Sequence, residues 1–286
     1  MTSPTVAVVV VTYSPGEMLD HFLDTLEKAT ASPYEVVLAD NGSTDGAPER
    51  AAGRAGVRLL PTGGNLGYGR AANHGAAATS APYVLVANPD VSFEPGALDA
   101  LLAAAGRWPR AGSVGPLILR PDGSRYPSGR ALPSLGGGIG HALCGWWWPG
   151  NPWTRAYRQE RGTPSEGPVG WLSGSCLLLR REAFDAVRGF DPAYFMYFED
   201  LDLGERIGRA GWQNVYVPSA VVTHEGGHAT RRHRAAMAAA HHRSAYLYLS
   251  RRYPGWRYLP LRLVLRGGLA GRAALARLVP EVGSAR

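Results

Sequence analysis

The sequence predicts an α/β fold, in which helices cover both faces of a mostly parallel sheet and a basic helical tail follows. Three observations carry this prediction. Apolar runs rich in β-branched residues alternate with segments of helical spacing over residues 5–118, which is typical of parallel sheets. Polar, glycine-rich loops follow three of these runs. Hydrophobic residues make up 45% of the 286 residues and charged residues 19%, so a packed core is expected.

Each element of the first half is predicted by its own pattern. Thr5–Thr12 is an unbroken apolar, β-branched run, as in strands that are buried on both faces. Met18, Phe22, Leu23 and Leu26 recur at helical spacing and predict a helix over Glu17–Ala29. By the same criteria we expect strands at Glu35–Ala39, Val57–Leu60, Tyr83–Ala87 and Val114–Leu119, helices at Leu66–Ala78 and Pro95–Ala105, and a turn at Asp122-Gly123.

The pattern breaks over residues 124–168. This segment contains Gly136–Gly138, Trp146–Trp148, Trp153 and six prolines, and it predicts a long irregular insertion. Regular structure is expected to resume with strands at Val169–Arg180, Asn214–Val217 and Ala220–Val222 and helices at Glu182–Arg188 and Glu199–Ala210, before a tail that is helical from about Ala235.

Cysteine content, hydropathy and charge exclude several classes of protein. Cys144 and Cys176 are too few for a disulfide framework, and neither lies in a metal-binding spacing. No apolar stretch approaches the roughly 18 residues of a membrane span, and no signal peptide is evident, so we expect a cytoplasmic protein. The net charge is +7, but the residues from Ala229 onward hold 12 arginines and one acid, Glu281. The tail therefore carries +11 and the rest of the chain −4.

Three polar loops are predicted to meet at one edge of the sheet. They are Asp40-Asn41-Gly42-Ser43, the segment Gly63–Arg70 and Asn88-Pro89-Asp90, each after a predicted strand. Parallel sheets bind ligands at the carboxyl ends of their strands. Hydrogen-bonding groups, close backbone approach and a carboxylate for a metal are what a nucleotide site needs. The alternative is that these residues only make turns.

Two further clusters contain titratable side chains. Glu199 and Asp200 follow the aromatic run Phe195–Phe198. Aromatic neighbours reduce the hydration of a carboxylate and raise its pKa, which suits a general base, although these acids could simply cap the following helix. Asp202 is expected to pair with Arg206 at i+4. His224 and His228 form the other cluster, and one of them could complete a metal site with Asp90.

In this order and spacing, the residues resemble family 2 glycosyltransferases, which have the GT-A fold. Four landmarks carry the resemblance: Val8–Tyr13, Asp40–Gly46, Asn65–Asn73 and the block Gly170–Leu203. The block is most similar to bacterial rhamnosyltransferases that use dTDP-L-rhamnose, and among these to enzymes that act on GlcNAc-diphosphoryl-polyprenol. The resemblance implies an inverting transfer in cell-envelope polysaccharide synthesis.

The resemblance also implies roles for individual residues. Asp200 is the general base, Glu199 and Trp171 bind the acceptor, and Asp90 and His224 hold Mg²⁺ or Mn²⁺ against the donor diphosphate. The donor-binding residues are Thr12, Tyr13, Asp40, Asn41, Asn65, Gly67, Arg70, Asn88 and Asp90. Asn88 stands where the family's DXD motif has its first Asp. We therefore expect weak metal binding without nucleotide.

These roles divide the chain into a GT-A catalytic domain over residues 1–230 and an Arg-rich amphipathic tail over 231–286. Within the domain, 1–123 is the nucleotide-binding half, 124–168 the insertion and 169–230 the acceptor and catalytic half. In the tail, Leu261, Leu265 and Leu269 recur every four residues beside Arg262 and Arg266. Such helices bind anionic interfaces, so we expect the tail to lie on the inner face of the cell membrane. The alternative is packing on its own domain or on a second subunit. Nucleic acid is not expected as a partner.

Two other functions compete with this one. Gly67–Ala72 fits the dinucleotide-binding pattern G-x-G-x-x-A, and Asp90 follows at a suitable distance. A nicotinamide-dependent oxidoreductase would, however, leave Asp40 and Glu199-Asp200 without roles, and the pattern does not follow the first strand. The weakened metal motif also allows a catalytically inactive GT-A-like binding module.

Overall fold

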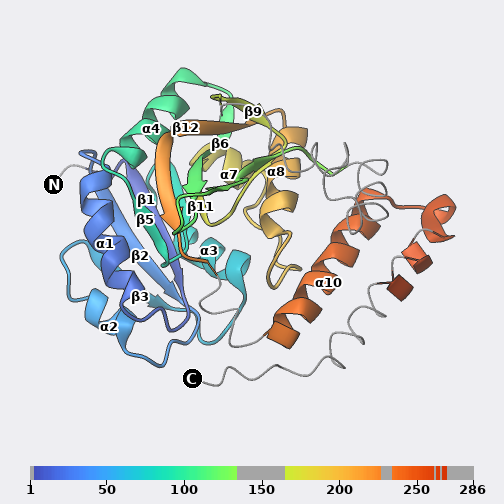
Figure 1. The fold of residues 1–286 in the computed structure, drawn as a ribbon, viewed down its shortest axis with the longest axis horizontal. Coiled ribbons are helices and arrows are strands. Elements are labelled where there is room, and N and C mark those ends of the chain that lie inside the picture. Colours follow the sequence, from blue (N-terminus) through green and yellow to red (C-terminus); the bar gives the residue numbers. More distant parts are fainter. Residues whose placement is uncertain (1–2, 134–164, 227–233, 261, 265, 269–286) are drawn as a thin grey trace.

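A computed structural model shows a ten-stranded sheet with helices on both faces (Figure 1). It describes residues 3–133, 165–226, 234–260, 262–264 and 266–268. The strand order is β3-β2-β1-β4-β11-β6-β12-β5, with β7 paired to β6 and β9 to β12. The predicted α/β class with a mostly parallel sheet is confirmed.

Parallel pairs dominate the sheet. The strand β1 (Val6–Thr12) lies between β2 (Tyr34–Asp40) and β4 (Tyr83–Ala87), and β3 (Val57–Pro61) extends the sheet beyond β2. The strand β12 (Gln213–His224) runs parallel to β6 (Ala111–Leu119). Four strands run antiparallel to their neighbours: β11 (Cys176–Arg180) between β4 and β6, β5 (Val91–Phe93) and β9 (Gly167–Val169) beside β12, and β7 (Arg125–Tyr126) beside β6.

The register of β1, β2 and β4 brings three loops together. Thr12 pairs with Asp40 at the ends of β1 and β2, and Val10 pairs with Ala87 at the end of β4. Because these strands are parallel, their following loops leave from the same edge. The Asp40 loop and Asn88-Pro89-Asp90 therefore share the edge that the sequence predicts.

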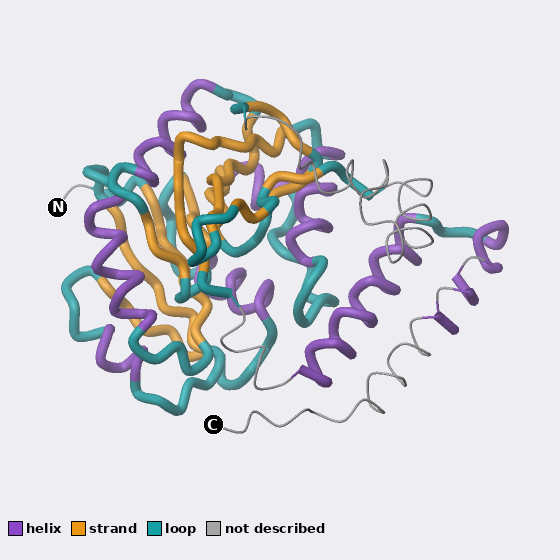
Figure 2. Tube along the Cα trace, viewed as in Figure 1, coloured by secondary structure: helices purple, strands orange, loops and turns teal. Residues whose placement is uncertain are grey.

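Each face of the sheet packs against its own helices, as the two helical layers in Figure 2 show. On one face, Val6, Val8 and Val10 join a core with α1 (Met18–Ala29) and α4 (Ala97–Arg107). On the other, Val9 and Val11 pack with α3 (Tyr68–Ala77), α7 (Arg181–Ala186) and α8 (Glu199–Arg209). Burial on both faces explains why β1 is continuously apolar.

The predicted strand Val169–Arg180 is wrong in one respect, because it is three strands. They are β9 (Gly167–Val169), β10 (Trp171–Leu172) and β11, which are separated by Gly170 and by residues 173–175. At Gly170 the chain crosses so close to its neighbour that a Cβ would lie 2.4 Å from the amide nitrogen of Leu132. The two pieces predicted at 214–217 and 220–222 are instead one strand, β12, with a register irregularity between Val217 and Val221.

Short elements appear where none was predicted. The helix α2 (Ala47–Ala51) and β5 add to the first half. The described ends of the predicted irregular insertion contain β7 (Arg125–Tyr126), β8 (Gly129–Arg130) and part of β9. The turn at Asp122-Gly123 is confirmed by the hydrogen bond from the Gly123 amide to the Arg120 carbonyl. Trp146–Trp148 and Trp153 lie outside the described residues.

The first part of the tail forms α10 (Arg234–Arg252), a 19-residue helix that packs beside α8 (Figure 1). Buried Tyr248 donates its hydroxyl to Glu205 Oε2 at 2.6 Å, and Arg252 forms an ion pair with the other oxygen of Glu205. Arg251 pairs with Asp191 at 2.5 Å. This part of the tail therefore packs on its own domain.

A 3₁₀ turn, η1 (Trp256–Tyr258), follows α10, and the described residues from 259 to 268 are helical. The predicted apolar stripe of Leu261, Leu265 and Leu269 lies outside the described residues. Within the part of the chain that the structure describes, no helix is long and apolar enough to span a bilayer.

Candidate active site

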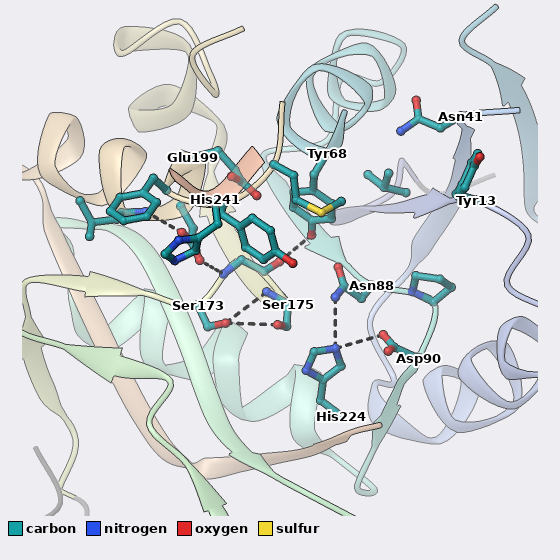
Figure 3. A pocket seen from close by; sticks show the side chains of 18 of the residues that line it. Tyr13, Asn41, Tyr68, Asn88, Asp90, Ser173, Ser175, Glu199, His224 and His241 are labelled. Atoms are coloured by element: carbon teal, nitrogen blue, oxygen red, sulfur yellow. Dashed lines mark hydrogen bonds and ion pairs between the residues drawn. The ribbon is translucent and has the colours of Figure 1, made fainter. Parts of the chain in front are cut away.

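A cavity of about 540 Å³ opens at the carboxyl edge of the sheet, between the loops after β1, β2 and β4, the start of α8 and the helix α10. Figure 3 shows its side chains, with Asn88, Asp90 and His224 in one group and Glu199, Tyr68 and His241 in another. The predicted site residues that line it are Tyr13, Asn41, Asn65, Asn88, Asp90, Trp171, Glu199, Asp200 and His224. Thr12, Asp40, Gly67 and Arg70 are not among the lining residues.

Asp40 organises the loop that follows β2. Its buried carboxylate accepts hydrogen bonds from the Thr12 hydroxyl at 2.7 Å, the Gly42 amide at 3.1 Å and both the amide and hydroxyl of Ser43 at 3.0 and 2.5 Å. The loop thereby holds Asn41 at the cavity, while Tyr13, which is 40% exposed, lies at its rim. Asp40 and Thr12 shape this end of the cavity from behind.

The glycine-rich loop before α3 fixes the segment that leads into α8. Gly67 has φ +86°, and a Cβ there would lie 2.1 Å from the carbonyl oxygen of Phe195. The amide of Tyr68 donates to that carbonyl at 3.0 Å. Arg70 donates its Nε–H to the Pro192 carbonyl at 2.7 Å. Gly67 and Arg70, which were predicted to contact the donor, therefore position the chain segment that leads to Glu199 and Asp200. This role also accounts for the apparent G-x-G-x-x-A pattern.

Asp90 and His224 face one another in the group of side chains that also contains Asn88. Asp90 Oδ1 lies 3.1 Å from His224 Nε2, and the side-chain nitrogen Nδ2 of Asn88 lies 3.1 Å from the same ring nitrogen. The amide of Gly226 donates to the other oxygen of Asp90 at 3.1 Å. His228 lies outside the described residues.

One carboxylate and one imidazole suit a divalent cation, because Mg²⁺ and Mn²⁺ accept oxygen and nitrogen ligands. No third His, Cys, Asp or Glu joins them into a metal-binding group in the described ranges. The donor set therefore fits a cation whose remaining ligands are oxygens of a bound diphosphate. The fit agrees with the expectation that nucleotide-free metal binding is weak.

Glu199 and Asp200 are presented by a strained turn. Tyr197 and Phe198 both have φ +67°, a left-handed conformation that costs a residue with a Cβ about 1–3 kcal/mol. The turn ends at the first residue of α8, so both carboxyl groups lie at the N-terminal end of a helix, where the helix dipole favours negative charge. Such strain is typical of functional sites. Further along α8, the predicted Asp202–Arg206 ion pair is confirmed at 2.6 Å.

The two neighbouring carboxyl groups have different surroundings. Burial raises the pKa of Asp200, while the amides of Gly174 and Leu201, which donate to it at 2.9 and 2.8 Å, and the charge of Arg130 oppose that rise. Burial and the charge of Asp200 raise the pKa of Glu199 to about 8. Its buried Oε2 receives no hydrogen bond within the described part of the chain. Asp200, whose carboxylate two backbone amides stabilise, therefore keeps its negative charge more readily than Glu199 does.

The lining residues that were not predicted as site residues include Tyr68, Arg130 and His241. The hydroxyl of Tyr68 donates to the Gly174 carbonyl at 2.5 Å and so holds the loop whose amide contacts Asp200. His241 comes from α10, where its ring packs against Tyr197 and Phe198 at centroid distances of 5.4 and 5.3 Å.

Trp171 is 6% exposed and supports the cavity wall. Its indole nitrogen donates to the Ala131 carbonyl at 3.2 Å, and the guanidinium of Arg130 lies over its ring at 5.0 Å. On the side of α8, a Cβ at Gly204 would lie 2.7 Å from the Trp171 Cβ. Trp171 is therefore packed between α8, on the side of its Cβ, and the Arg130 guanidinium, over its ring.

The sheet order, with a cavity at the carboxyl edge of the parallel strands, is that of the GT-A fold. Two solved structures share this fold. The mannosyltransferase PcManGT from Pyrobaculum calidifontis, in complex with GDP-Man and Mn²⁺, matches with a TM-score of 0.58 at 18% identity, over 100% of this chain and 77% of that chain. GalNAc-T7 with UDP, GalNAc and Mn²⁺ matches with a TM-score of 0.58 at 17% identity, over 79% and 44%.

Sequence comparison gives the family. Residues 7–188 match the model of glycosyl transferase family 2, and residues 158–278 match glycosyl transferase family group 2. The N-acetylglucosaminyl-diphospho-decaprenol L-rhamnosyltransferase of Mycobacterium tuberculosis (strain H37Rv) is 59% identical over 280 residues, which cover 94% of this chain and 91% of that protein. Rhamnosyltransferase WbbL of Escherichia coli is 39% identical over 88 residues, 31% of this chain and 33% of that protein.

The chain belongs to glycosyl transferase family 2, and it is a glycosyltransferase. The resemblance of the four landmarks is thereby confirmed. The alternative of a nicotinamide-dependent oxidoreductase is wrong, because its glycine pattern belongs to a loop that positions the segment before α8.

Proposed function

We propose that this enzyme transfers L-rhamnose from dTDP-rhamnose to a hydroxyl of GlcNAc-diphosphoryl-polyprenol, with inversion at the anomeric carbon, during synthesis of a cell-envelope polysaccharide. One observation carries the proposal: a single cavity holds Asp200, whose carboxylate two backbone amides fix in place, and, in a separate group, the Asp90–His224 pair. The mycobacterial relative, whose name gives this sugar and this type of acceptor, supports the choice of substrates.

Asp200 acts as the general base in this proposal. Two backbone amides hold its carboxylate in place, and the acceptor hydroxyl transfers its proton to that carboxylate as its oxygen attacks the anomeric carbon. Glu199 is protonated at neutral pH because its pKa is raised to about 8. It therefore donates a hydrogen bond to the acceptor sugar from a carboxyl group with one unpartnered oxygen in the described chain.

The donor occupies the side of the cavity that contains Asp90. We assign Mg²⁺ or Mn²⁺ to Asp90 and His224, with Asn88 beside them. When bound, such a cation neutralises the charge that develops on a departing nucleoside diphosphate. Tyr13, Asn41 and Asn65 line the part of the cavity near the Asp40 loop. We assign the thymine and ribose to this part, where Asp40, Thr12, Gly67 and Arg70 act by fixing the loops around them.

The test is product formation with defined substrates. Purified enzyme is incubated with dTDP-rhamnose and GlcNAc-diphosphoryl-polyprenol, with Mg²⁺, Mn²⁺ or a chelator, and the product is identified by mass spectrometry and its linkage by NMR. We expect a rhamnosylated lipid of inverted configuration. Transfer from a UDP- or GDP-sugar with none from dTDP-rhamnose would contradict the donor. Binding of dTDP without turnover would support a catalytically inactive module instead.

A lipid-linked acceptor requires an enzyme that works at a bilayer surface, and the residues after α10 suit one. Trp256 is 87% exposed, Leu263 59% and Val264 73%, and Arg257, Arg262 and Arg266 lie within the same stretch. Exposed aromatic and apolar residues among cations bind anionic interfaces. We therefore infer that this stretch contacts the cytoplasmic face of the membrane.

Co-sedimentation with anionic liposomes tests the membrane contact. The triple variant Trp256→Ser, Leu263→Ser, Val264→Ser should stay in the supernatant while the wild-type enzyme sediments. These residues lie beyond the ion pairs that hold α10, so the domain stays intact. Unchanged sedimentation of the variant would contradict this contact.

A further inference from the structure

Arg130 is the one Arg or Lys among the described residues that line the cavity. The proposed reaction brings two diphosphates to this cavity, one in the donor and one in the lipid-linked acceptor. Asp90 and His224 suit the donor diphosphate through a cation. The acceptor diphosphate needs a positive group of its own, because burying a phosphate without one is costly.

The guanidinium of Arg130 is held by two aromatic rings. Its central carbon lies 5.2 Å from the centroid of the Tyr126 ring and 5.0 Å from that of the Trp171 ring. Its Nε–H donates to the Pro127 carbonyl at 2.7 Å. Stacking and this hydrogen bond fix the plane of the guanidinium before any ligand arrives. A planar, pre-oriented guanidinium is well suited to phosphate, which it can bind through two parallel hydrogen bonds.

Arg130 belongs to the wall next to the catalytic base. It pairs with Trp171 between β8 and β10, and the loop that follows β10 contains Gly174, whose amide donates to Asp200. The nucleotide loops, in contrast, follow β1, β2 and β4. Arg130 and Asp200 line the same cavity, and the charge of Arg130 favours the ionised form of Asp200.

We propose that Arg130 binds the diphosphate of the acceptor, so that the sugar attached to that diphosphate presents its hydroxyl to Asp200. This inference rests on the proposed function for the identity of the acceptor. It also gives Tyr126 and Trp171 a role, because their rings hold the guanidinium.

The experiment compares Arg130→Gln with wild-type enzyme on two acceptors. One is GlcNAc-diphosphoryl-farnesol, and the other is octyl N-acetylglucosaminide, which has the sugar without phosphate. In Arg130→Gln the KM for the diphosphate acceptor should rise about 10- to 100-fold, since a charge-assisted hydrogen bond is lost. The kcat/KM for the octyl glycoside should fall by much less, because only the effect of Arg130 on the charge of Asp200 is lost there. The Kd for dTDP should change less than about threefold.

Arg120→Gln is the matched control. Arg120 stacks on the same Tyr126 ring at 5.6 Å but is exposed and does not line the cavity. Its substitution should leave both acceptors unaffected. Arg130→Lys should restore only part of the KM, because an ammonium lacks the planar pair of donors.

The outcomes separate this inference from the proposed function. Equal losses on both acceptors, or weaker dTDP binding in Arg130→Gln, would overturn the role of Arg130 while transfer by the wild type stands. If no rhamnose is transferred, the binding of GlcNAc-diphosphoryl-farnesol to the enzyme can still be measured by calorimetry without donor. Binding that is lost in Arg130→Gln would support Arg130 even if rhamnose is not transferred. Absence of binding by the wild type would overturn both.

Discussion

Replacing Glu199 by glutamine should make the enzyme more stable at alkaline pH relative to the wild type. The native state keeps the proton of Glu199 up to a pKa of about 8, whereas the unfolded chain releases it near the ordinary value of 4.5. Between these values the native state binds more protons. The free energy of unfolding contributed by this group therefore falls as the pH rises, by at most about 1.4 kcal/mol per pH unit, and levels off above pH ~8.

Between about pH 5 and pH 8 the wild type loses roughly 3 kcal/mol of unfolding free energy through Glu199. Glutamine does not titrate, so this loss is absent in Glu199→Gln. The assay is urea unfolding followed by tryptophan fluorescence at intervals from about pH 5 to pH 9. Titrating groups that do not interact with Glu199 cancel in the difference between the two proteins, whereas Asp200, its neighbour, does not. Glu182→Gln, at an exposed position of α7, is the control and should track the wild type. If the curves of Glu199→Gln and the wild type run parallel, Glu199 does not hold a proton in the folded enzyme.

Further predictions concern the loops, the metal and the tail. Gly67→Ala should destabilise the enzyme by more than about 3 kcal/mol, because the added Cβ would meet the Phe195 carbonyl. Gly63→Ala should cost about 1 kcal/mol, because Gly63 has a similar φ of +81° but open space around it. Similar urea midpoints for the two variants would contradict the docking of the loop that contains Gly67. Asp90→Ala should abolish the gain in dTDP affinity that Mn²⁺ gives the wild type, as measured by calorimetry, and a retained gain would exclude Asp90 as a ligand. Tyr248→Phe should cost about 1–3 kcal/mol by losing its bond to Glu205, with Tyr246→Phe as the control. Equal melting temperatures for these two variants would contradict the docking of α10.

The main strands and helices were predictable because their patterns are long. Seven buried residues in β1, six of them apolar, and the helical spacing of α1 leave little choice of structure. The three-residue β5 and five-residue α2 are too short to show a period. The break of Val169–Arg180 at residues 173–175 was missed although Ser173-Gly174-Ser175 is a turn signal, because the apolar residues on either side suggested one continuous strand. That break aims the Gly174 amide at Asp200.

The candidate site divides in the same way. Residues that follow strand ends, such as Asn88 and Asp90, were predictable because parallel strands fix where their loops go. Arg130 lies in a segment with no periodicity, and only the pairing of β8 with β10 places it at the cavity. His241 is one of two adjacent histidines on a basic helix, and only the docking of α10 brings it to the cavity. Such long-range contacts leave no local mark in a sequence.

The direct test of Asp200 as the general base is the rate of rhamnosyl transfer by Asp200→Asn, with the dTDP affinity measured on the same preparation. Removing a general base should lower kcat by at least about 100-fold, while the Kd for dTDP stays within about twofold because Asp200 is not among the residues assigned to the nucleotide. A loss of less than about tenfold with intact dTDP binding would show that another group takes the proton, and the assignment of Asp200 would fail.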